Sequence, residues 1–287
     1  MIIEKAFAKI NLTLSIGKKR KDGYHDIDSV MHSISLHDKI TLEKSGEISL
    51  AVTKGRAPFG KENLMWKAAE LFFRETGISG GVRMKLEKYI PAEAGLGGGS
   101  SDAAAALRGL DKLLKTNLPA EQLLDMGKQI GADVPFCMVG GCCRCQGIGE
   151  KLTPLSGADR LFLVIVRPDV PIETKRAYEI LDKLGEKTEN TTEACRRALE
   201  ERNPEKLAAA LSNDFEKELF PVYPALEETS RYLKSFHCPV LMTGSGSAFF
   251  LIGQSEEEQI RIAEKIKKDR PLWFTAAAET RADRNLS

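Results

Sequence analysis

The sequence predicts a two-domain protein of the α+β class, with helical and extended segments alternating along the chain. Three observations support this prediction. The chain has 287 residues, a length at which about two domains are expected. Its composition, 42% hydrophobic and 29% charged, is ordinary for a globular protein with a buried core. Segments with apolar residues at helical spacing alternate with short segments rich in β-branched residues, and turn-rich pieces separate the two kinds.

The first half of the chain begins with extended segments and continues into helices. Short alternating or β-branched runs predict strands at residues 2–7, 11–16, 29–36 and 38–42, interrupted by the turn-rich piece GKKRKDGYHD. Apolar spacing predicts a helix at 63–76, and period-two alternation predicts a strand at 81–90. Beyond a glycine-rich stretch, helices are expected at 100–114 and 119–130, the second with proline near its first turn.

The second half is mainly helical in its middle and mixed at its end. We expect strands at 142–146 and 160–166, helices with intervening turns from 174 to about 233, strands at 239–243 and 248–253, a charged helix at 256–268 and a last strand at 273–278. Proline, glycine and polar residues gather in PLSGAD, so residues 153–159 predict the boundary between the domains. The expected domains are therefore residues 1–155 and 156–287.

Charge and cysteine content exclude several classes of function. Lys and Arg total 42 against 41 Asp and Glu, so a formal charge of +1 supplies no long-range field for nucleic acid or an anionic membrane. The first residues lack the layout of a secretory signal, and no stretch of about twenty apolar residues occurs. The cytoplasm is therefore the expected location. The six cysteines predict reduced thiols, and CMVGGCCRC lacks the paired C-x-x-C spacing of most zinc sites, which favours buried thiols over a metal site.

The stretch PAEAGLGGGSSDAAA, from Pro91 to Ala105, predicts a phosphate site. Glycine loses more conformational freedom on folding than any other residue, so ordering this backbone is costly. A glycine loop leading into Ser100 and Ser101 at the start of a helix places free N–H groups and the positive end of the helix dipole at one point. The alternative is a glycine-rich turn with a Ser-Ser-Asp cap, although three adjacent glycines exceed what a turn requires.

This loop differs from the two commonest nucleotide loops. A P-loop requires lysine and then serine or threonine after its last glycine, whereas Gly99 leads directly into Ser100. The sixth position of a dinucleotide fingerprint counted from Gly95 is Ser100 instead of glycine. The protein-kinase triplets DFG and HRD are also absent. P-loop, Rossmann and protein-kinase folds are therefore disfavoured.

GLGGGSSDAA does resemble the second motif of the GHMP small-molecule kinases. AFAKINLTLSIG with KDGYHDIDSVM, GADVPF at 131–136 and TGSGSAFF at 243–250 are similar to further motifs of one branch of that family, in the same order. The resemblance implies a ribosomal-S5-like N-terminal domain, a ferredoxin-like C-terminal domain and an active site in the cleft between them. It also implies that ATP, with Mg²⁺, phosphorylates the 2-hydroxyl of 4-diphosphocytidyl-2-C-methylerythritol on the non-mevalonate route to isoprenoid precursors. The expected partner is this cytidine diphosphate derivative, with no nucleic acid or membrane, and the expected assembly is a monomer or homodimer.

The resemblance assigns catalysis to Lys9 and Asp133. Lys9 lies in the apolar run FAKINL, where an ammonium group needs an anionic partner unless the side chain simply extends to solvent. Asp133 lies before Pro135, where an aspartate commonly caps a turn or helix. By resemblance, Asp133 accepts the proton of the acceptor hydroxyl or orients that hydroxyl, and Lys9 lies nearby and stabilises developing charge. The choice between base and orienting group stays open, because a loose transition state requires little deprotonation.

The binding residues are likewise implied by the resemblance. Those for ATP are Pro91, Ala92, Glu93, Ala94, Gly95, Leu96, Gly97, Gly98, Gly99, Ser100 and Ser101, with Asn63 and Lys88 near adenosine, and Ser101 is also the expected magnesium ligand. Glu93 departs from the family pattern and points either to solvent or towards magnesium. Those for the acceptor are Asn11, Tyr24, His25, Tyr178, Thr243, Gly244, Ser245 and Gly246. Tyr24 and His25 form a plausible platform for a flat base, with Tyr178 across the ring.

Two alternatives remain. The protein could be another GHMP kinase acting on homoserine or mevalonate, but those acceptors contain no base for the DGYH segment to stack against. It could also be a catalytically silent nucleotide-binding regulator on the same fold. Retention of both Lys9 and Asp133 argues against that alternative.

Overall fold

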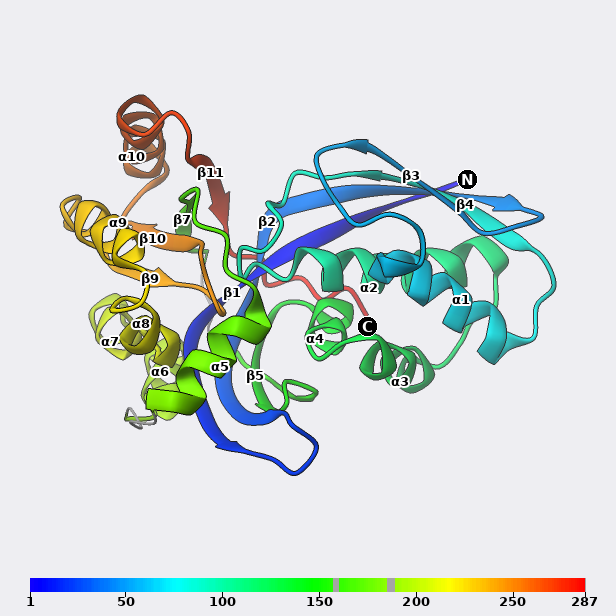
Figure 1. Cartoon of the computed structure of the whole chain (residues 1–287), viewed down its shortest axis with the longest axis horizontal. Coiled ribbons are helices and arrows are strands. Elements are labelled where there is room, and N and C mark those ends of the chain that lie inside the picture. The colour runs from blue at the N-terminus through cyan, green and yellow to red at the C-terminus, as the bar shows by residue number, and fades with distance from the viewer. Residues whose placement is uncertain (157–159, 185–188, 287) are drawn as a thin grey trace.

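The computed structural model describes residues 1–156, 160–184 and 189–286, and in this part of the chain the strands form two sheets (Figure 1). The strands are β1 (Ile2–Lys19), β2 (His25–Ser45), β3 (Ser49–Lys54), β4 (Gly81–Glu87), β5 (Cys142–Gly147), β6 (Lys151–Pro154), β7 (Phe162–Arg167), β8 (Ser212–Asn213), β9 (Val240–Met242), β10 (Phe249–Gly253) and β11 (Phe274–Glu279). The helices are α1 (Leu64–Thr76), α2 (Gly98–Leu114), α3 (Ala120–Ile130), α4 (Val134–Val139), α5 (Thr174–Leu184), α6 (Thr192–Glu200), α7 (Pro204–Ala210), α8 (Asp214–Leu219), α9 (Pro224–Lys234) and α10 (Glu256–Asp269).

The first sheet is built on the long antiparallel pair of β1 and β2. It runs in the order β3-β4-β2-β1-β8, and β5, which carries β6, pairs with the first part of β2. β3 and β8 join in parallel, whereas the other pairs are antiparallel. The pairing of β1 with β2 shifts register between Phe7 and Lys9 and again between Asn11 and Thr13. Such irregularities re-aim side chains, and these two flank the predicted catalytic lysine.

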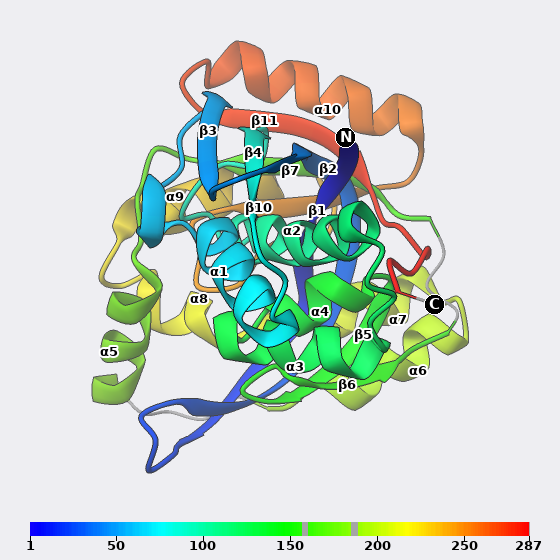
Figure 2. The same ribbon diagram turned by 90° about the vertical axis from the view of Figure 1, so that its right-hand side faces the viewer.

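Helices α1 to α4 cover one face of this sheet, as Figures 1 and 2 show. α2 packs closely on the sheet and on its neighbouring helices because its side chains are small: Ala103 to Ala106, which point to all sides of the helix, are fully buried. A Cβ at Gly109 would lie only 2.6 Å from Cδ1 of Leu42 on β2, so glycine permits the close approach. This packing fixes the direction of α2 and thereby the position of its N-terminus.

The second sheet has the order β11-β7-β10-β9, and α10 packs on it. Parts of the second half of the chain pair with the first sheet instead of this one. β8 pairs with Thr13 and Leu14 of β1, and beyond β11 the isolated pairs Ile34 with Thr280 and Gly140 with Arg284 return the C-terminal segment to the first sheet. Figure 1 accordingly shows the C-terminus near α4. Elements from both halves of the sequence therefore meet where the two sheets adjoin.

Most expected elements are confirmed within a few residues, and the α+β class is confirmed. The strands expected at 2–7 and 11–16 are one strand, β1, and those at 29–36 and 38–42 are both parts of β2. The structure adds β3, α4 and β6, which are short and have weak periodicity. The expected domain boundary was residues 153–159, of which 157–159 lie outside the described residues. The division into domains 1–155 and 156–287 stays a prediction. Two parts of the second range, β8 and residues 280–284, pair with strands of the first sheet or with residues near it.

Among the described helices, none combines the length and apolar character that crossing a bilayer requires.

Candidate active site

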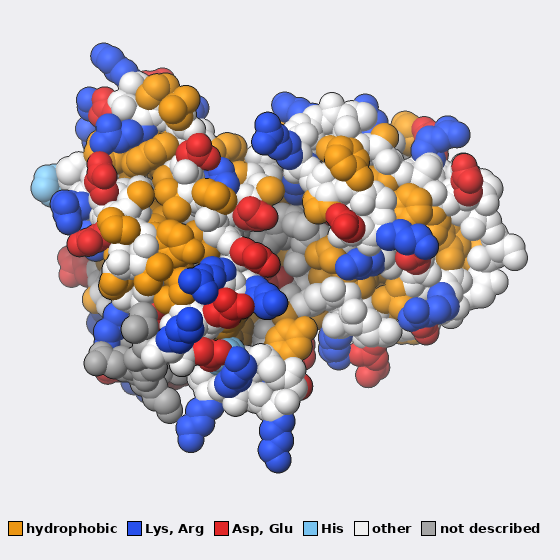
Figure 3. Space-filling view, viewed as in Figure 1, with side chains coloured by type: hydrophobic (Ala, Val, Ile, Leu, Met, Phe, Trp, Pro, Cys, Tyr) orange, Lys and Arg blue, Asp and Glu red, His pale blue; other side chains and the backbone are white. Residues whose placement is uncertain are grey.

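A cavity of about 1050 Å³ opens between the two parts of the molecule, and Figure 3 shows the hollow between two lobes. One wall is the glycine loop that precedes α2. The floor is β1 with the residues before α4, and the opposite wall is α5 with the turn after β9. Gly23 and Tyr24, between β1 and β2, and His25, the first residue of β2, line one end. Residues 9 and 245 are thus brought together although they are distant in sequence.

The glycine loop presents backbone to this cavity. Gly95 and Gly97 adopt φ values of 72° and 67°, and Gly97 is the N-cap of α2. The Ser101 N–H donates to the Gly97 carbonyl at 2.8 Å, so the N–H groups of the preceding helical turn have no acceptor within the helix. Unpaired N–H groups at a helix N-terminus, with the dipole behind them, suit a phosphate group.

The loop also contacts the turn after β9, mainly through backbone atoms, and the Thr243 hydroxyl donates to the Gly95 carbonyl at 3.5 Å. A Cβ at Gly95 would lie 2.0 Å from the carbonyl oxygen of Thr243, and the Ala248 N–H donates to the Ala94 carbonyl at 3.2 Å. The second and third predicted motifs therefore form one rigid rim. Gly244 and Ser245 line the cavity at this rim.

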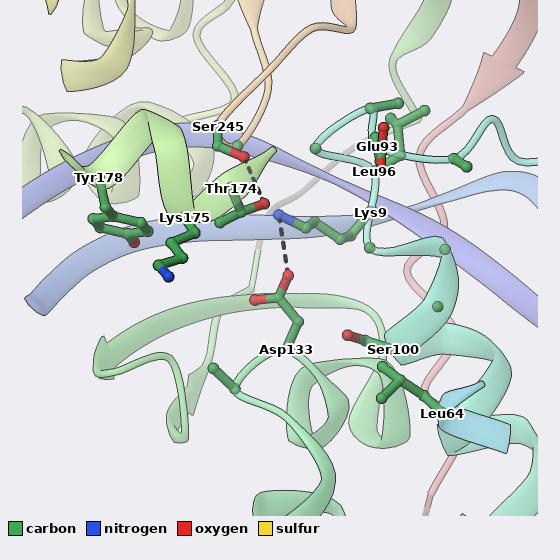
Figure 4. A pocket seen from close by; sticks show the side chains of 18 of the residues that line it. Lys9, Leu64, Glu93, Leu96, Ser100, Asp133, Thr174, Lys175, Tyr178 and Ser245 are labelled. Carbon is green, nitrogen blue, oxygen red and sulfur yellow. Dashed lines mark hydrogen bonds and ion pairs between the residues drawn. The ribbon is translucent and has the colours of Figure 1, made fainter. Parts of the chain in front are cut away.

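Lys9 and Asp133 face one another in the middle of the cavity (Figure 4). Lys9 Nζ lies 3.5 Å from Oδ2 of Asp133 and donates to Oδ1 of Asn11 at 2.7 Å. The Lys9 side chain is 5% exposed, whereas that of Asp133 is 31% exposed, so the carboxylate keeps a face open to a ligand. The Asn11 amide group in turn donates to Ser29 at 2.8 Å, which fixes the orientation of its oxygen. An ammonium group beside a partly exposed carboxylate is suited to hold both an anion and a hydroxyl group.

Aromatic side chains lie at the other end of the cavity. The His25 and Tyr178 rings stack at a centroid distance of 5.0 Å and an angle of 19°, and Phe215 packs edge-on against Tyr178. Tyr24 is 56% exposed and also lines the cavity. Because His25 and Tyr178 contact each other, a flat base cannot lie between these two rings. A base at this end would lie against the pair, with the Tyr24 ring available to cover it.

Several predicted residues support the cavity instead of lining it. Thr243 accepts a hydrogen bond from the Asn11 N–H at 3.0 Å, and the Gly246 N–H donates to the Thr243 carbonyl at 3.1 Å, so both residues hold the turn in place. Ser101 is buried and donates to the Phe7 carbonyl at 2.7 Å. Ser101 does not line the cavity, whereas Ser100 does, and the predicted contact of Ser101 with magnesium stays untested.

Asn63 lines the cavity with both of its polar atoms already bonded. Its Oδ1 caps α1 by accepting from the Met65 N–H at 2.9 Å, and its Nδ2 donates to the Pro58 carbonyl. This pairing shapes the segment before α1, where Pro58 also lines the cavity. The predicted contact with adenosine stays untested at this residue.

Lys88 is the centre of a buried charged cluster behind the glycine loop. Its Nζ pairs with Asp38, and with Asp102 at 2.8 Å. Asp38 also accepts from the Ile90 N–H at 2.8 Å, which ties the loop to β2. Burial raises the pKa of Asp102 well above its usual range, against the opposing charge of Lys88, and so favours the neutral form of this carboxyl. The structure therefore favours a supporting role for the Lys88 ammonium group over a contact with adenosine.

Replacing Lys88 by Met leaves the Asp38 carboxylate buried without its cation. We expect the free energy of unfolding to fall by about 3–5 kcal/mol, measured by urea denaturation. Asp102→Asn replaces the carboxyl by a neutral amide of the same shape. It is expected to cost about 1 kcal/mol or less, because burial favours the neutral form of Asp102.

Lys61→Met is the matched control, because Lys61 is 79% exposed and lies 3.7 Å from Glu70. Such exposed pairs contribute about 0–1 kcal/mol. A Lys88→Met protein as stable as this control would show that the cluster does not support the fold.

Of α5, the sequence indicated only Tyr178 as a site residue and gave no sign of its neighbours. Thr174, Lys175, Glu179 and Asp182 all line the cavity, and Thr174 shares a hydrogen bond of 3.0 Å with Ser245 (Figure 4). These residues follow an ordinary amphipathic helical pattern with no motif. Only the packing of α5 across the cleft gives them a place in the site.

No group of three or more His, Cys, Asp or Glu side chains arranged to hold a metal ion occurs among the described residues. The six cysteines are free, and all but Cys238 are buried. Burial raises the pKa of Cys137 to about 12 and that of Cys143 to about 11, which keeps these side chains as thiols. Glu93 and Ser100 are the oxygen-bearing side chains that the glycine loop presents to the cavity. Such oxygens fit Mg²⁺, which commonly binds through one or two carboxylates and substrate phosphates.

A phosphate-binding helix N-terminus facing a lysine–carboxylate pair defines a phosphotransferase that acts on small molecules. The chain belongs to the GHMP kinase family: the family patterns "GHMP kinases N terminal domain" and "GHMP kinases C terminal" match residues 63–141 and 195–271. The protein is accordingly an ATP-dependent small-molecule kinase, as the sequence predicted.

Curated relatives and solved structures agree with this assignment. The chain is 40% identical over 269 residues to the 4-diphosphocytidyl-2-C-methyl-D-erythritol kinase of Caldicellulosiruptor saccharolyticus, covering 93% of both chains. It is 41% identical over 280 residues to the enzyme of that name from Desulfitobacterium hafniense, covering 96% of this chain and 95% of the relative. A crystal structure of 4-(cytidine 5'-diphospho)-2C-methyl-D-erythritol kinase superposes with a TM-score of 0.81 at 33% identity, covering 97% and 99% of the two chains. A homoserine kinase from Cytophaga hutchinsonii, with a TM-score of 0.76 and 17% identity over 99% and 96% of the chains, shares the fold.

Proposed function

We propose that this protein transfers the γ-phosphoryl group of ATP to the 2-hydroxyl of 4-diphosphocytidyl-2-C-methyl-D-erythritol, on the non-mevalonate route to isoprenoid precursors. The observation that carries the proposal is the Lys9–Asp133 pair, which lies between a phosphate-binding loop and an aromatic end of the same cavity. Relatives about 40% identical over more than nine-tenths of the chain bear the corresponding name. Homoserine and mevalonate kinases match at 17% identity or less and support the fold alone.

The residues divide the work by position. The glycine loop holds the phosphates of the donor with backbone N–H groups, and Asn63 shapes the wall near the nucleoside. Asp133 orients the acceptor hydroxyl or takes its proton, and Lys9 stabilises negative charge on the transferred group. Asn11 and the turn at Gly244 and Ser245 hold the acceptor between these groups and the aromatic end. Little covalent work remains for the protein, because phosphoryl transfer depends mainly on alignment and charge stabilisation.

We propose Mg²⁺ as the metal, held by donor phosphates with Glu93 or Ser100, where it would neutralise charge on the phosphate oxygens. The proposed partner is a small cytidine diphosphate derivative, without nucleic acid or membrane, and the proposed location is the cytoplasm. The net charge of +1 supports the proposal of a small-molecule partner without nucleic acid or membrane, since it provides no field to attract a polyanion.

The proposal is tested by supplying purified protein with ATP, Mg²⁺ and the cytidine acceptor, with homoserine and mevalonate as competing acceptors. We expect transfer to the cytidine acceptor alone. Tyr24→Ala should raise KM for it about 5- to 150-fold, because stacking of a base contributes roughly 1–3 kcal/mol. Tyr24→Phe, which keeps the ring, is the matched control and should stay close to wild type.

Two other outcomes separate the alternatives. Phosphorylation of homoserine or mevalonate in preference to the cytidine acceptor would assign the protein to another branch of the family. ATP binding without transfer to any of the three acceptors would favour a silent nucleotide-binding regulator.

A further inference from the structure

The wall of the cavity formed by α5 carries three charged side chains. Lys175, Glu179 and Asp182 all line the cavity. The two carboxylates already have partners. Glu179 pairs with Arg176 at 3.2 Å, and the Asp182 carboxylate is bound by Lys19. Lys175 makes no ion pair or hydrogen bond with any residue that the structure describes. This wall therefore presents one cation whose charge no carboxylate balances.

Lys175 lies between the two ends of the cavity. In Figure 4 its ammonium group lies between the Tyr178 ring and the Asp133 carboxylate. The preceding residue, Thr174, shares a hydrogen bond of 3.0 Å with Ser245, so the start of α5 is tied to the turn after β9. The backbone that carries Lys175 is thereby held in place, whereas its exposed side chain is free to meet a ligand.

The other cations that line the cavity have different positions. Lys9 faces the carboxylate at the reacting hydroxyl, Lys88 is buried behind the glycine loop, and Lys19 is bound to a carboxylate of α5. Arg56 lies between β3 and α1, next to the wall that we assign to the donor nucleoside. Lys175 is therefore the cation that the described part of the chain offers to the middle of the acceptor.

We propose that Lys175 is a specificity residue for the acceptor: its ammonium group binds the diphosphate that joins the cytidine to the methylerythritol. The inference deepens the proposed function and rests on it for the identity of the acceptor. In that molecule the diphosphate stands between the base and the hydroxyl that is phosphorylated. With the base at the aromatic end and the hydroxyl at Asp133, the diphosphate lies beside Lys175.

The chemistry of lysine suits this task. An ammonium group donates charge-assisted hydrogen bonds to phosphate oxygens, and these are stronger than hydrogen bonds between neutral groups. A neutral ligand that fills only the aromatic end gains nothing from this charge. Lys175 thereby favours acceptors that carry a diphosphate over those that carry none.

The test measures the binding of cytidine and CDP by NMR titration, with the donor site filled by a non-hydrolysable ATP analogue so that CDP cannot occupy the glycine loop. Lys175→Met keeps the length of the side chain and removes its charge. It should weaken CDP binding about tenfold, as expected for loss of one charge-assisted hydrogen bond, and leave the affinity for cytidine unchanged. Lys175→Arg restores the cation and should bind CDP within about threefold of wild type.

Lys183→Met is the matched control. Lys183 is exposed on the same helix, about two turns further on, and does not line the cavity. This variant should bind cytidine and CDP like wild type. A loss of CDP affinity as large as that in Lys175→Met would trace the effect to the net charge of the helix and would overturn the inference.

Three results with the Lys175 variants would also overturn it. These are unchanged CDP binding by Lys175→Met, an equal loss of cytidine and CDP affinity in that variant, or a loss in Lys175→Arg as large as in Lys175→Met. The second result would indicate a merely structural role, and the third a requirement for shape instead of charge. Failure of the proposed function is separate, since it would appear as absence of transfer from ATP to the cytidine acceptor while CDP binding still depends on Lys175.

Discussion

Asp133→Asn is expected to lower kcat by about 10²–10⁴-fold, the usual contribution of a positioned acid–base group. The amide keeps the shape of the carboxylate but removes the charge that faces Lys9 at 3.5 Å. It also removes the carboxylate that we propose accepts the proton of the acceptor hydroxyl or orients that hydroxyl. ATP should still bind, because the glycine loop is formed by other residues. The measurements are steady-state turnover with the cytidine acceptor and ATP affinity by calorimetry.

Asp125→Asn is the matched control. Asp125 lies on α3, and its side chain is 58% exposed. Among the described residues its carboxylate pairs only with Lys128. Asp125→Asn therefore measures the effect of removing a carboxylate that lies away from the cavity. Its turnover should equal that of wild type. An Asp133→Asn protein with near-normal turnover would remove Asp133 from catalysis.

Gly95→Ala is expected to weaken ATP binding by more than about tenfold and to lower stability by roughly 2–5 kcal/mol. Gly95 has φ of 72°, a conformation that costs other residues about 1–2 kcal/mol. The added Cβ would also lie 2.0 Å from the Thr243 carbonyl oxygen, where neither backbone can yield without moving the loop or the turn. Calorimetric ATP titration and urea denaturation measure the two effects.

Gly46→Ala is the control for glycine substitution in general. Nothing lies within 4 Å of a Cβ at Gly46, and its φ is not positive. It should bind ATP and unfold like wild type. Wild-type affinity and stability in Gly95→Ala would show that the loop and the turn after β9 do not need this close contact.

The sequence predicted the elements best where their pattern is local. Helices α1, α2 and α3 begin and end within two residues of expectation, because capping, proline and apolar spacing act over one or two turns. The sequence divides β1 in two because Lys9 interrupts its apolar pattern. Lys9 is buried in the structure and lines the cavity, so the interruption lies inside the strand and does not mark its end.

The candidate site was predicted in part. Lys9 and Asp133 were paired from their motifs, and the structure brings them together. Ser101 and Thr243 were placed at ligands, but their hydroxyls bond to Phe7 and Asn11. A sequence motif contains two kinds of residue: those that contact a ligand and those that hold the backbone of the site in place. The motif does not show which residue is of which kind. That distinction depends on which way each side chain points after packing.

Two properties of this protein were determined by its sequence alone. The glycine loop with its helix follows from local backbone chemistry, and the order of its motifs identified the kinase family. Only the tertiary structure decided that α5 crosses the cleft and that Asp182 holds His25 at 2.7 Å. These residues are 157 positions apart in sequence. No local pattern encodes such a contact, because it arises when burial of apolar side chains packs α5 against α8 and places Tyr178 on the His25 ring.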